Sequence, residues 1–316
     1  MNVPVFDLHC DTANELIGLG GAECSALRSN QVHIDLERAK ALGGYAQCFA
    51  CFTTTSTKYN PVDVFEKKLS AILREIEKNH DVIRLAYNPA DIDENQRNGL
   101  MSAILTIEGT AGFGFDPALL EDLHKIGFLI SSLGWNEQNP LTGSCVTGGG
   151  LTDQGREYVK ELQRLGMLVD VSHISDEGFW DIVDMTNGPV IATHSNSRSL
   201  CNVERNLTDD MFRAICSTDG VAGINLYPVF LGQDPTIDTV CDHVFHFLDL
   251  DPDGKHIALG GDLDGIESLP VGFCGVQDYA KLSDRLLQRG LSETMVYNIF
   301  WNNALEVLQR AVQNDS

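Results

Sequence analysis

The chain has 316 residues, 43% of them hydrophobic, a length and composition that suit a globular protein with a substantial core. Acidic residues outnumber basic ones by 45 to 22, and the resulting net charge of −23 argues against binding to the phosphate backbone of a nucleic acid. Nine cysteines without framework spacing indicate free thiols in a reducing compartment, and the absence of a signal peptide or a long apolar run leads us to expect a cytoplasmic protein without a membrane span.

Eight short runs rich in Val, Ile, Leu and Phe predict strands that are buried on both faces, as in a parallel sheet. In chain order they are 3–8, 45–52, 100–107, 128–133, 167–171, 189–193, 221–226 and 256–259. Amphipathic segments between them predict helices at 62–77, 153–165, 176–185, 211–216, 278–288 and 292–313. A small insertion near 79–98, with a strand and a helix of its own in 81–98, interrupts the alternation before the third strand.

Strands that alternate with helices eight times predict an α/β fold, the (β/α)8 TIM barrel, as one domain over residues 1–316. The alternative is an open, doubly wound sheet, but no glycine-rich dinucleotide fingerprint follows the first strand. Functional residues of a barrel lie at the carboxyl ends of its strands. The polar residues at those ends are therefore the candidates for chemistry.

The first strand leads into His9 and Asp11, and the third into Glu108. If the first strand continues through Asp11, alternation places His9 and Asp11 on one face, where an imidazole and a carboxylate could hold one cation. A carboxylate after the apolar run 103–107 is costly to bury unpaired, so Glu108 needs a cation partner or the open mouth of the barrel. A salt bridge to Lys or Arg is the simpler alternative for Glu108.

The fifth and sixth strands each end in a histidine, His173 and His194. One such histidine is usually a satisfied core residue, but two at equivalent positions, together with His9, favour a metal site. The eighth strand ends at Asp262, which could accept a proton from a metal-bound water or simply shape the turn that follows it. Three histidines, two aspartates and one glutamate suit two divalent ions that share a carboxylate.

These residues belong to six motifs whose order resembles the membrane (renal) dipeptidase family, the M19 branch of the amidohydrolase superfamily. The resemblance extends from about residue 5 to about residue 310. The motifs are Asp7-Leu8-His9-Cys10-Asp11, Glu108-Gly109, Ser172-His173-Ile174-Ser175, Thr193-His194-Ser195, Arg205-Asn206-Leu207 and Gly260-Gly261-Asp262-Leu263-Asp264-Gly265.

The resemblance implies a metal centre with two divalent ions per chain, which in this family are zinc. His9 and Asp11 would hold one ion, and His173 and His194 the other. Glu108 would bridge both ions, where many relatives of the wider superfamily use a carboxylated lysine. The chain would then be a metal-dependent hydrolase.

The resemblance also implies roles in substrate binding and proton transfer. Asp262 would handle the proton of a hydroxide that bridges the metals, and Arg205 would bind the terminal carboxylate of a dipeptide. Trp135 falls where relatives have a His or Tyr near the substrate, and its indole is neither an acceptor nor a base. The expected partner is a small dipeptide, including dipeptides with a C-terminal D-residue.

Two other functions stay open on the sequence alone. The same metals could serve another amidohydrolase reaction, such as hydrolysis of an N-acyl amino acid or a lactone, and Trp135 keeps this alternative in view. A metal-binding protein without turnover is disfavoured because every implied metal and proton residue is present. A homodimer is compatible with the sequence.

Overall fold

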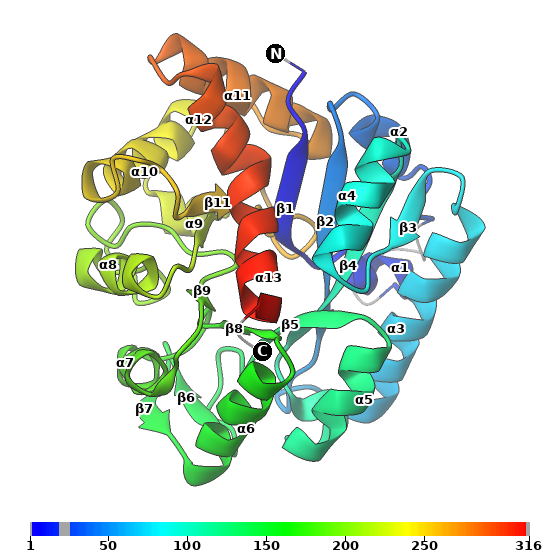
Figure 1. Cartoon of the computed structure of the whole chain (residues 1–316), viewed down its shortest axis with the longest axis vertical. Coiled ribbons are helices and arrows are strands. Elements are labelled where there is room, and N and C mark those ends of the chain that lie inside the picture. The colour runs from blue at the N-terminus through cyan, green and yellow to red at the C-terminus, as the bar shows by residue number, and fades with distance from the viewer. Residues whose placement is uncertain (1, 19–25, 314–316) are drawn as a thin grey trace.

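A computed structural model describes residues 2–18 and 26–313, and it contains eight parallel strands in a barrel surrounded by helices (Figure 1). The pairing order is β10-β11-β1-β2-β4-β5-β8-β9, and a parallel bridge between Ala192 and Ala222 joins the two ends of this row. The predicted TIM barrel is therefore confirmed, and the open sheet is excluded. The barrel strands are β1 (Val5–Cys10), β2 (Tyr45–Phe52), β4 (Met101–Glu108), β5 (Phe128–Ser132), β8 (Leu168–Asp170), β9 (Val190–Ile191), β10 (Ala222–Ile224) and β11 (Ile257–Leu259).

Several helices begin where a side chain caps the first free backbone amides. Thr152, Ser175 and Thr208 each accept a hydrogen bond from an amide in the first turn of the helix that follows. The helices are α1 (Thr12–Leu16), α2 (Leu36–Ala39), α3 (Pro61–Lys78), α4 (Pro89–Arg97), α5 (Leu120–Lys125), α6 (Asp153–Arg164), α7 (Asp176–Met185), α8 (Asp209–Ser217), α9 (Pro228–Leu231), α10 (Ile237–Leu250), α11 (Tyr279–Gln288), α12 (Glu293–Tyr297) and α13 (Asn303–Gln313).

The last predicted helix, 292–313, is not one regular helix. A π-helical turn at Asn298–Asn302 separates α12 from α13. In Figure 1, α13 lies across one end of the barrel, and its Leu305 and Leu308 join a buried cluster with Phe6 and Ala46 from the beginnings of β1 and β2. This helix therefore covers the amino end of the barrel and leaves the carboxyl ends of the strands for the site.

Two additions lie outside the barrel order. The strand β3 (Ile83–Leu85) pairs with β4 and precedes α4, as expected for the extra strand and helix in 81–98. The hairpin of β6 (Thr142–Ser144) and β7 (Gly148–Leu151) was not predicted, because its glycine-rich second strand shows no hydrophobic alternation. The eight cysteines that the structure describes are free thiols, as predicted.

Candidate metal centre

Three of the predicted residues meet at the carboxyl ends of β1 and β4. The Nε2 atom of His9 lies 3.5 Å from Oδ2 of Asp11 and 3.5 Å from Oε2 of Glu108. It also lies 3.9 Å from Oδ1 of Asp262, which follows β11. All four residues are buried. One imidazole therefore faces three carboxylates in a space that excludes most water.

The other two histidines lie near the second carboxylate oxygen of Glu108. Its Oε1 atom is 2.9 Å from Nε2 of His173 and 3.9 Å from Nε2 of His194, and the two Nε2 atoms are 3.0 Å apart. The ring of His194 also stacks on that of His9 with centroids 3.7 Å apart. The two oxygens of Glu108 thus point toward two adjoining groups of imidazole nitrogens.

Asp11 reaches this cluster by a different route from the one predicted. The strand β1 ends at Cys10, and its register against β2 shifts between Asp7 and Cys10. Asp11 itself lies outside the strand and precedes α1. The strand alternation that was expected to align Asp11 with His9 was therefore wrong, although the two side chains are neighbours.

Two of the clustered residues have an unusual backbone. His173 has φ of +71° and Asp262 has φ of +58°, in the left-handed region that costs a non-glycine residue about 1 kcal/mol or more. At Asp262 a hydrogen bond from its amide to the carbonyl of His9 holds this geometry at 3.2 Å. Each residue lies three positions beyond the end of a barrel strand, where this backbone turns its side chain into the mouth.

The charges of the three histidines are set by burial and by the surrounding groups. Burial alone would lower the pKa of His9, but Glu108 and Asp11 outweigh it and raise that pKa well above its usual value. Burial lowers the pKa of His173 to about 4, and that of His194 falls well below its usual range for the same reason. These shifts favour the neutral form of His173 and His194 and the charged form of His9.

The pKa values of the carboxyl groups of Glu108 and Asp262 shift in opposite directions. Burial opposes the charge of Glu108, but His9 and His173 hold the pKa of its carboxyl well below the usual range. Burial raises the pKa of Asp262 to about 6, even though His9 favours its charged form. One buried carboxyl is thus firmly ionised, while the other can exchange a proton near neutral pH.

The donor set fits divalent cations. One ligand atom each from His9, Glu108 and His194 lies within 4.8 Å of the others, and His9, Asp11 and Asp262 form a second such group among the described residues. The buried Nε2 of His9 and Oε2 of Glu108 have no hydrogen-bond partner. Buried polar atoms rarely lack a partner, and these two point at each other across a gap suited to a cation.

Arg205 is buried beside this cluster. Its Nη1 donates to Oγ of Ser195 at 2.7 Å and its Nε to Nδ1 of His173 at 3.2 Å, while Nη2 has no hydrogen-bond partner. The ring of Phe230 packs against the guanidinium with 5.6 Å from its centroid to Cζ. A buried cationic group with an unused donor is suited to bind an anionic ligand.

Trp135 is half-buried in the mouth, with its ring 5.1 Å from that of Phe52 and 6.1 Å from that of His173. The neighbouring Asn136 places Oδ1 2.8 Å from Nδ1 of His173. Sequence reasoning missed Asn136 and also Asn225, whose amide donates to Oδ2 of Asp262 at 3.1 Å. Asn136 lies just beyond the predicted strand 128–133, and Asn225 lies inside the predicted strand 221–226, although β10 ends at Ile224. An asparagine at such a position carries no signal that separates this role from a turn.

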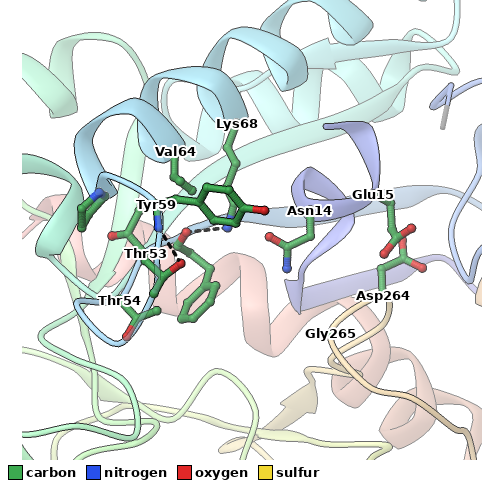
Figure 2. A pocket seen from close by; sticks show the side chains of 12 residues that line it. Asn14, Glu15, Thr53, Thr54, Tyr59, Val64, Lys68, Asp264 and Gly265 are labelled. Carbon is green, nitrogen blue, oxygen red and sulfur yellow. Dashed lines mark hydrogen bonds between the residues drawn. The ribbon is translucent and has the colours of Figure 1, made fainter. Parts of the chain in front are cut away.

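Two cavities adjoin the cluster. One of about 210 Å³ is lined by Glu108, Trp135 and Asp262 among others. The second, of about 290 Å³, lies between α1, α3 and the end of β2 (Figure 2). Both are lined by Gly265, where an added Cβ would lie 2.5 Å from Oδ2 of Asp11 and 2.5 Å from Oδ1 of Asp262. The two cavities therefore meet next to the candidate ligands.

Figure 2 shows polar groups on opposite walls of the larger cavity. Lys68 and Tyr59 lie on one side, Glu15 and Asp264 on the other, and Asn14 between them. The buried amine of Lys68 donates to the carbonyl of Phe52. This cavity can thus receive a polar group that extends from the metal cluster.

Among the described residues, no helix has the length and apolar character that crossing a membrane requires.

Comparisons with known proteins agree with this geometry. Residues 1–316 match the family model for membrane dipeptidase, peptidase family M19. An uncharacterized dipeptidase of Schizosaccharomyces pombe is 36% identical over 208 residues, which are 64% of this chain and 51% of that protein. An uncharacterized protein from the region 5′ of pqqA in Klebsiella pneumoniae is 31% identical over 270 residues, 80% of this chain and 98% of that protein. The match thus spans about half the length of the fungal relatives.

Solved structures share the fold. A metallopeptidase from Rhodobacter sphaeroides, in complex with a phosphinate mimic of the dipeptide L-Ala-D-Ala, has a TM-score of 0.88 at 24% identity over 98% of this chain and all of that chain. A second structure, the dipeptidase AC of family M19, also has a TM-score of 0.88, at 25% identity over 98% of this chain and 99% of that one. Since the family model covers the whole chain, this protein belongs to the membrane dipeptidase family, peptidase family M19.

Proposed function

We propose that this protein is a zinc-dependent dipeptidase with two metal ions per chain. The observation that carries the proposal is Glu108, whose Oε2 lies near His9 and whose Oε1 lies near His173 and His194. In this arrangement His9 and Asp11 would hold one ion, His173 and His194 the second, and Glu108 both. Imidazole and carboxylate ligands of this kind suit zinc.

Two bound divalent ions would supply an activated water and polarise the carbonyl of the peptide bond. The residues of the chain then have to move the proton. Asp262 is suited to this step because its buried Oδ1 lies 3.9 Å from Nε2 of the candidate ligand His9, within reach of a water held there, and it could pass the proton on to the leaving amine. The amide of Asn225 holds Oδ2 of Asp262 and leaves Oδ1 toward His9.

Arg205 would bind the carboxylate at the C-terminus of the dipeptide. Its buried Nη2 has a free donor, and a charge-assisted hydrogen bond in a dry site is strong. Its contacts with Ser195 and His173 place it beside the ends of β8 and β9. The carboxylate would therefore lie on that side of the metal centre.

The larger cavity lies on the other side, between α1, α3 and β2. A dipeptide whose carboxylate meets Arg205 would therefore extend its N-terminal residue toward this cavity, with the peptide bond over Glu108 and Asp262. The relative from Rhodobacter sphaeroides with a mimic of L-Ala-D-Ala supports a dipeptide of this size, including one with a C-terminal D-residue.

Trp135 favours a second candidate, the hydrolysis of N-acyl amino acids or lactones. Its indole offers only an N–H donor, and it packs against Phe52 in the mouth, where an apolar acyl group would make contact. The same metals and the same Asp262 would serve this reaction. The two candidates differ in whether the substrate must carry a free α-amino group.

We further propose that residues 1–316 work as one domain and that the protein resides in the cytoplasm, since free cysteines are typical of a reducing compartment. Its partner would be the small substrate.

A panel of dipeptides tests the function. Zinc-loaded protein is assayed with L,L- and L,D-dipeptides, with their N-acetylated forms, and with simple lactones. We expect hydrolysis of free dipeptides and a loss of rate on acetylation. Hydrolysis of the acetylated forms or lactones alone would favour the second candidate, and no turnover of any substrate with two zinc ions bound would contradict both.

A further inference from the structure

Behind His194 lies a short chain of hydrogen bonds that no proposed role yet includes. The hydroxyl of Thr193 is 2.6 Å from Oδ2 of Asp170 and 2.7 Å from Nδ1 of His194. All three residues are buried. Asp170 is the last residue of β8, and Thr193 and His194 follow β9, so the chain links two neighbouring strands at their carboxyl ends.

The single proton of the Thr193 hydroxyl decides the direction of these bonds. A carboxylate only accepts hydrogen bonds, so the hydroxyl must donate to Asp170. Its oxygen can then only accept from Nδ1 of His194. A ligand imidazole is neutral and carries one N–H, so a proton on Nδ1 leaves a lone pair on Nε2, the atom that faces Glu108 and His173.

Asp170 is held firmly enough to enforce this direction. Its Oδ1 accepts from the amides of Ser172 and Thr193, both at 2.9 Å. With the Thr193 hydroxyl, three donors therefore point at one buried carboxylate. The hydroxyl of Ser172 lies 3.3 Å from that of Thr193 and accepts from the amide of His194 at 3.2 Å, so it can donate to Thr193 without disturbing the order.

We propose that Asp170 and Thr193 are positioning residues that fix the tautomer and ring orientation of His194, so that Nε2 is ready to bind a metal ion before the ion arrives. The inference rests on the proposed metal-dependent function. The second ring nitrogen of a metal-binding histidine commonly donates a hydrogen bond to a carboxylate or carbonyl. Here the Thr193 hydroxyl lies between His194 and the carboxylate of Asp170.

His173 differs from His194 because its neighbours do not fix its tautomer. Its Nδ1 lies 2.8 Å from Oδ1 of Asn136, which can accept, and 3.2 Å from Nε of Arg205, which can only donate. Either tautomer of His173 therefore finds a partner. Of the two histidines assigned to the second metal ion, His194 alone has its tautomer fixed by its neighbours.

The first test is nuclear magnetic resonance of protein with ¹⁵N-labelled histidine. We expect the metal-free and zinc-loaded wild-type protein to carry the His194 proton on Nδ1 in both states. A proton on Nε2 of His194 in the metal-free protein would overturn the proposal, and this readout needs no variant to fold.

The second test measures zinc affinity by competition with a chelator. Thr193→Val removes the hydroxyl and keeps the shape of the side chain. We expect it to lower the affinity for the more weakly bound zinc ion, or for both ions, by about 10- to 100-fold. Thr193→Ser keeps the hydroxyl and should restore the affinity to within about threefold of wild type. Thr218→Val is the matched control, because the Thr218 hydroxyl accepts from the amide of Val190 at the other end of β9.

The outcomes separate this inference from the proposed function. If wild-type protein binds no zinc, the proposed function fails. If wild-type protein binds two ions and Thr193→Val binds them equally well, the positioning role fails while the function stands. Should Thr193→Val not fold, the serine variant and the resonance of wild-type His194 still decide the question.

Discussion

Gly265 offers a test in which a single methyl group acts on the candidate site and on little else. An alanine there would place its Cβ 2.5 Å from one oxygen of Asp11 and 2.5 Å from one oxygen of Asp262. Contacts between carbon and oxygen are normally more than 3 Å long, so both carboxylates must move by several tenths of an ångström to about 1 Å. The backbone of Gly265 is not in the left-handed region, and the residue is exposed, so the fold should tolerate the change.

The expected effect falls on catalysis. A misplacement of about 1 Å at reacting groups costs about 10²-fold in rate, so we expect Gly265→Ala to lower kcat/KM for L-Ala-D-Ala by about that factor. The free energy of unfolding should fall by about 1 kcal/mol, typical of point substitutions, because the added methyl group displaces two buried carboxylates. The assay is steady-state hydrolysis with saturating zinc, together with thermal unfolding of the same samples.

Gly99→Ala is the control, because it should lower stability without changing the candidate site. Gly99 has φ of +71°, and an added Cβ would meet nothing within 4 Å. The strained backbone should cost about 1 kcal/mol of stability, a shift of roughly 1–2 °C in Tm for a chain of 316 residues, without an effect on kcat/KM. Wild-type kcat/KM in Gly265→Ala would refute the assignment of Asp11 and Asp262 to the reacting site.

Three further predictions follow from the same site. Elemental analysis of protein purified without chelator should find about two divalent ions per chain, and one or fewer after incubation with zinc would contradict a dinuclear centre. Asp262→Asn should keep the metal content and lower kcat by about 10²-fold or more, since the amide keeps the shape but cannot accept the proton; unchanged turnover would make Asp262 a turn residue. Arg205→Met should cost about 2–4 kcal/mol in transition-state binding of a dipeptide and much less for the dipeptide amide, which lacks the carboxylate; equal losses in kcat/KM on both substrates would show a structural role instead.

The barrel was predictable because its strands are buried on both faces. Such strands leave continuous apolar runs, and the runs at 45–52 and 128–133 match β2 and β5 to within a residue. The hairpin of β6 and β7 lacks this signal, since three of the four residues of β7 are glycines. The π-helical turn at Asn298–Asn302 is likewise invisible, because it changes the hydrogen bonding and leaves the apolar pattern of a helix in place.

The structure brings the candidate residues close together, as the sequence predicts, but much of their geometry has no signal in the sequence. His173 and His194 could be located because each lies within three residues of the end of an apolar strand. The left-handed backbone of His173 could not be predicted, since a histidine does not require that conformation. Arg205 was expected in a loop on the metal face, and the structure buries its guanidinium against the ring of His173, a long-range contact that has no local signal.

The helix that covers the amino end of the barrel also determines when the chain can fold. Leu305, Leu308 and Ala311 of α13 belong to the same buried cluster as Phe6 of β1, so β1 and α13 share one core. During synthesis this core stays open to water until α13 has left the ribosome. The barrel therefore reaches its native stability only after α13 has been made, and the emerging chain exposes apolar surface until then.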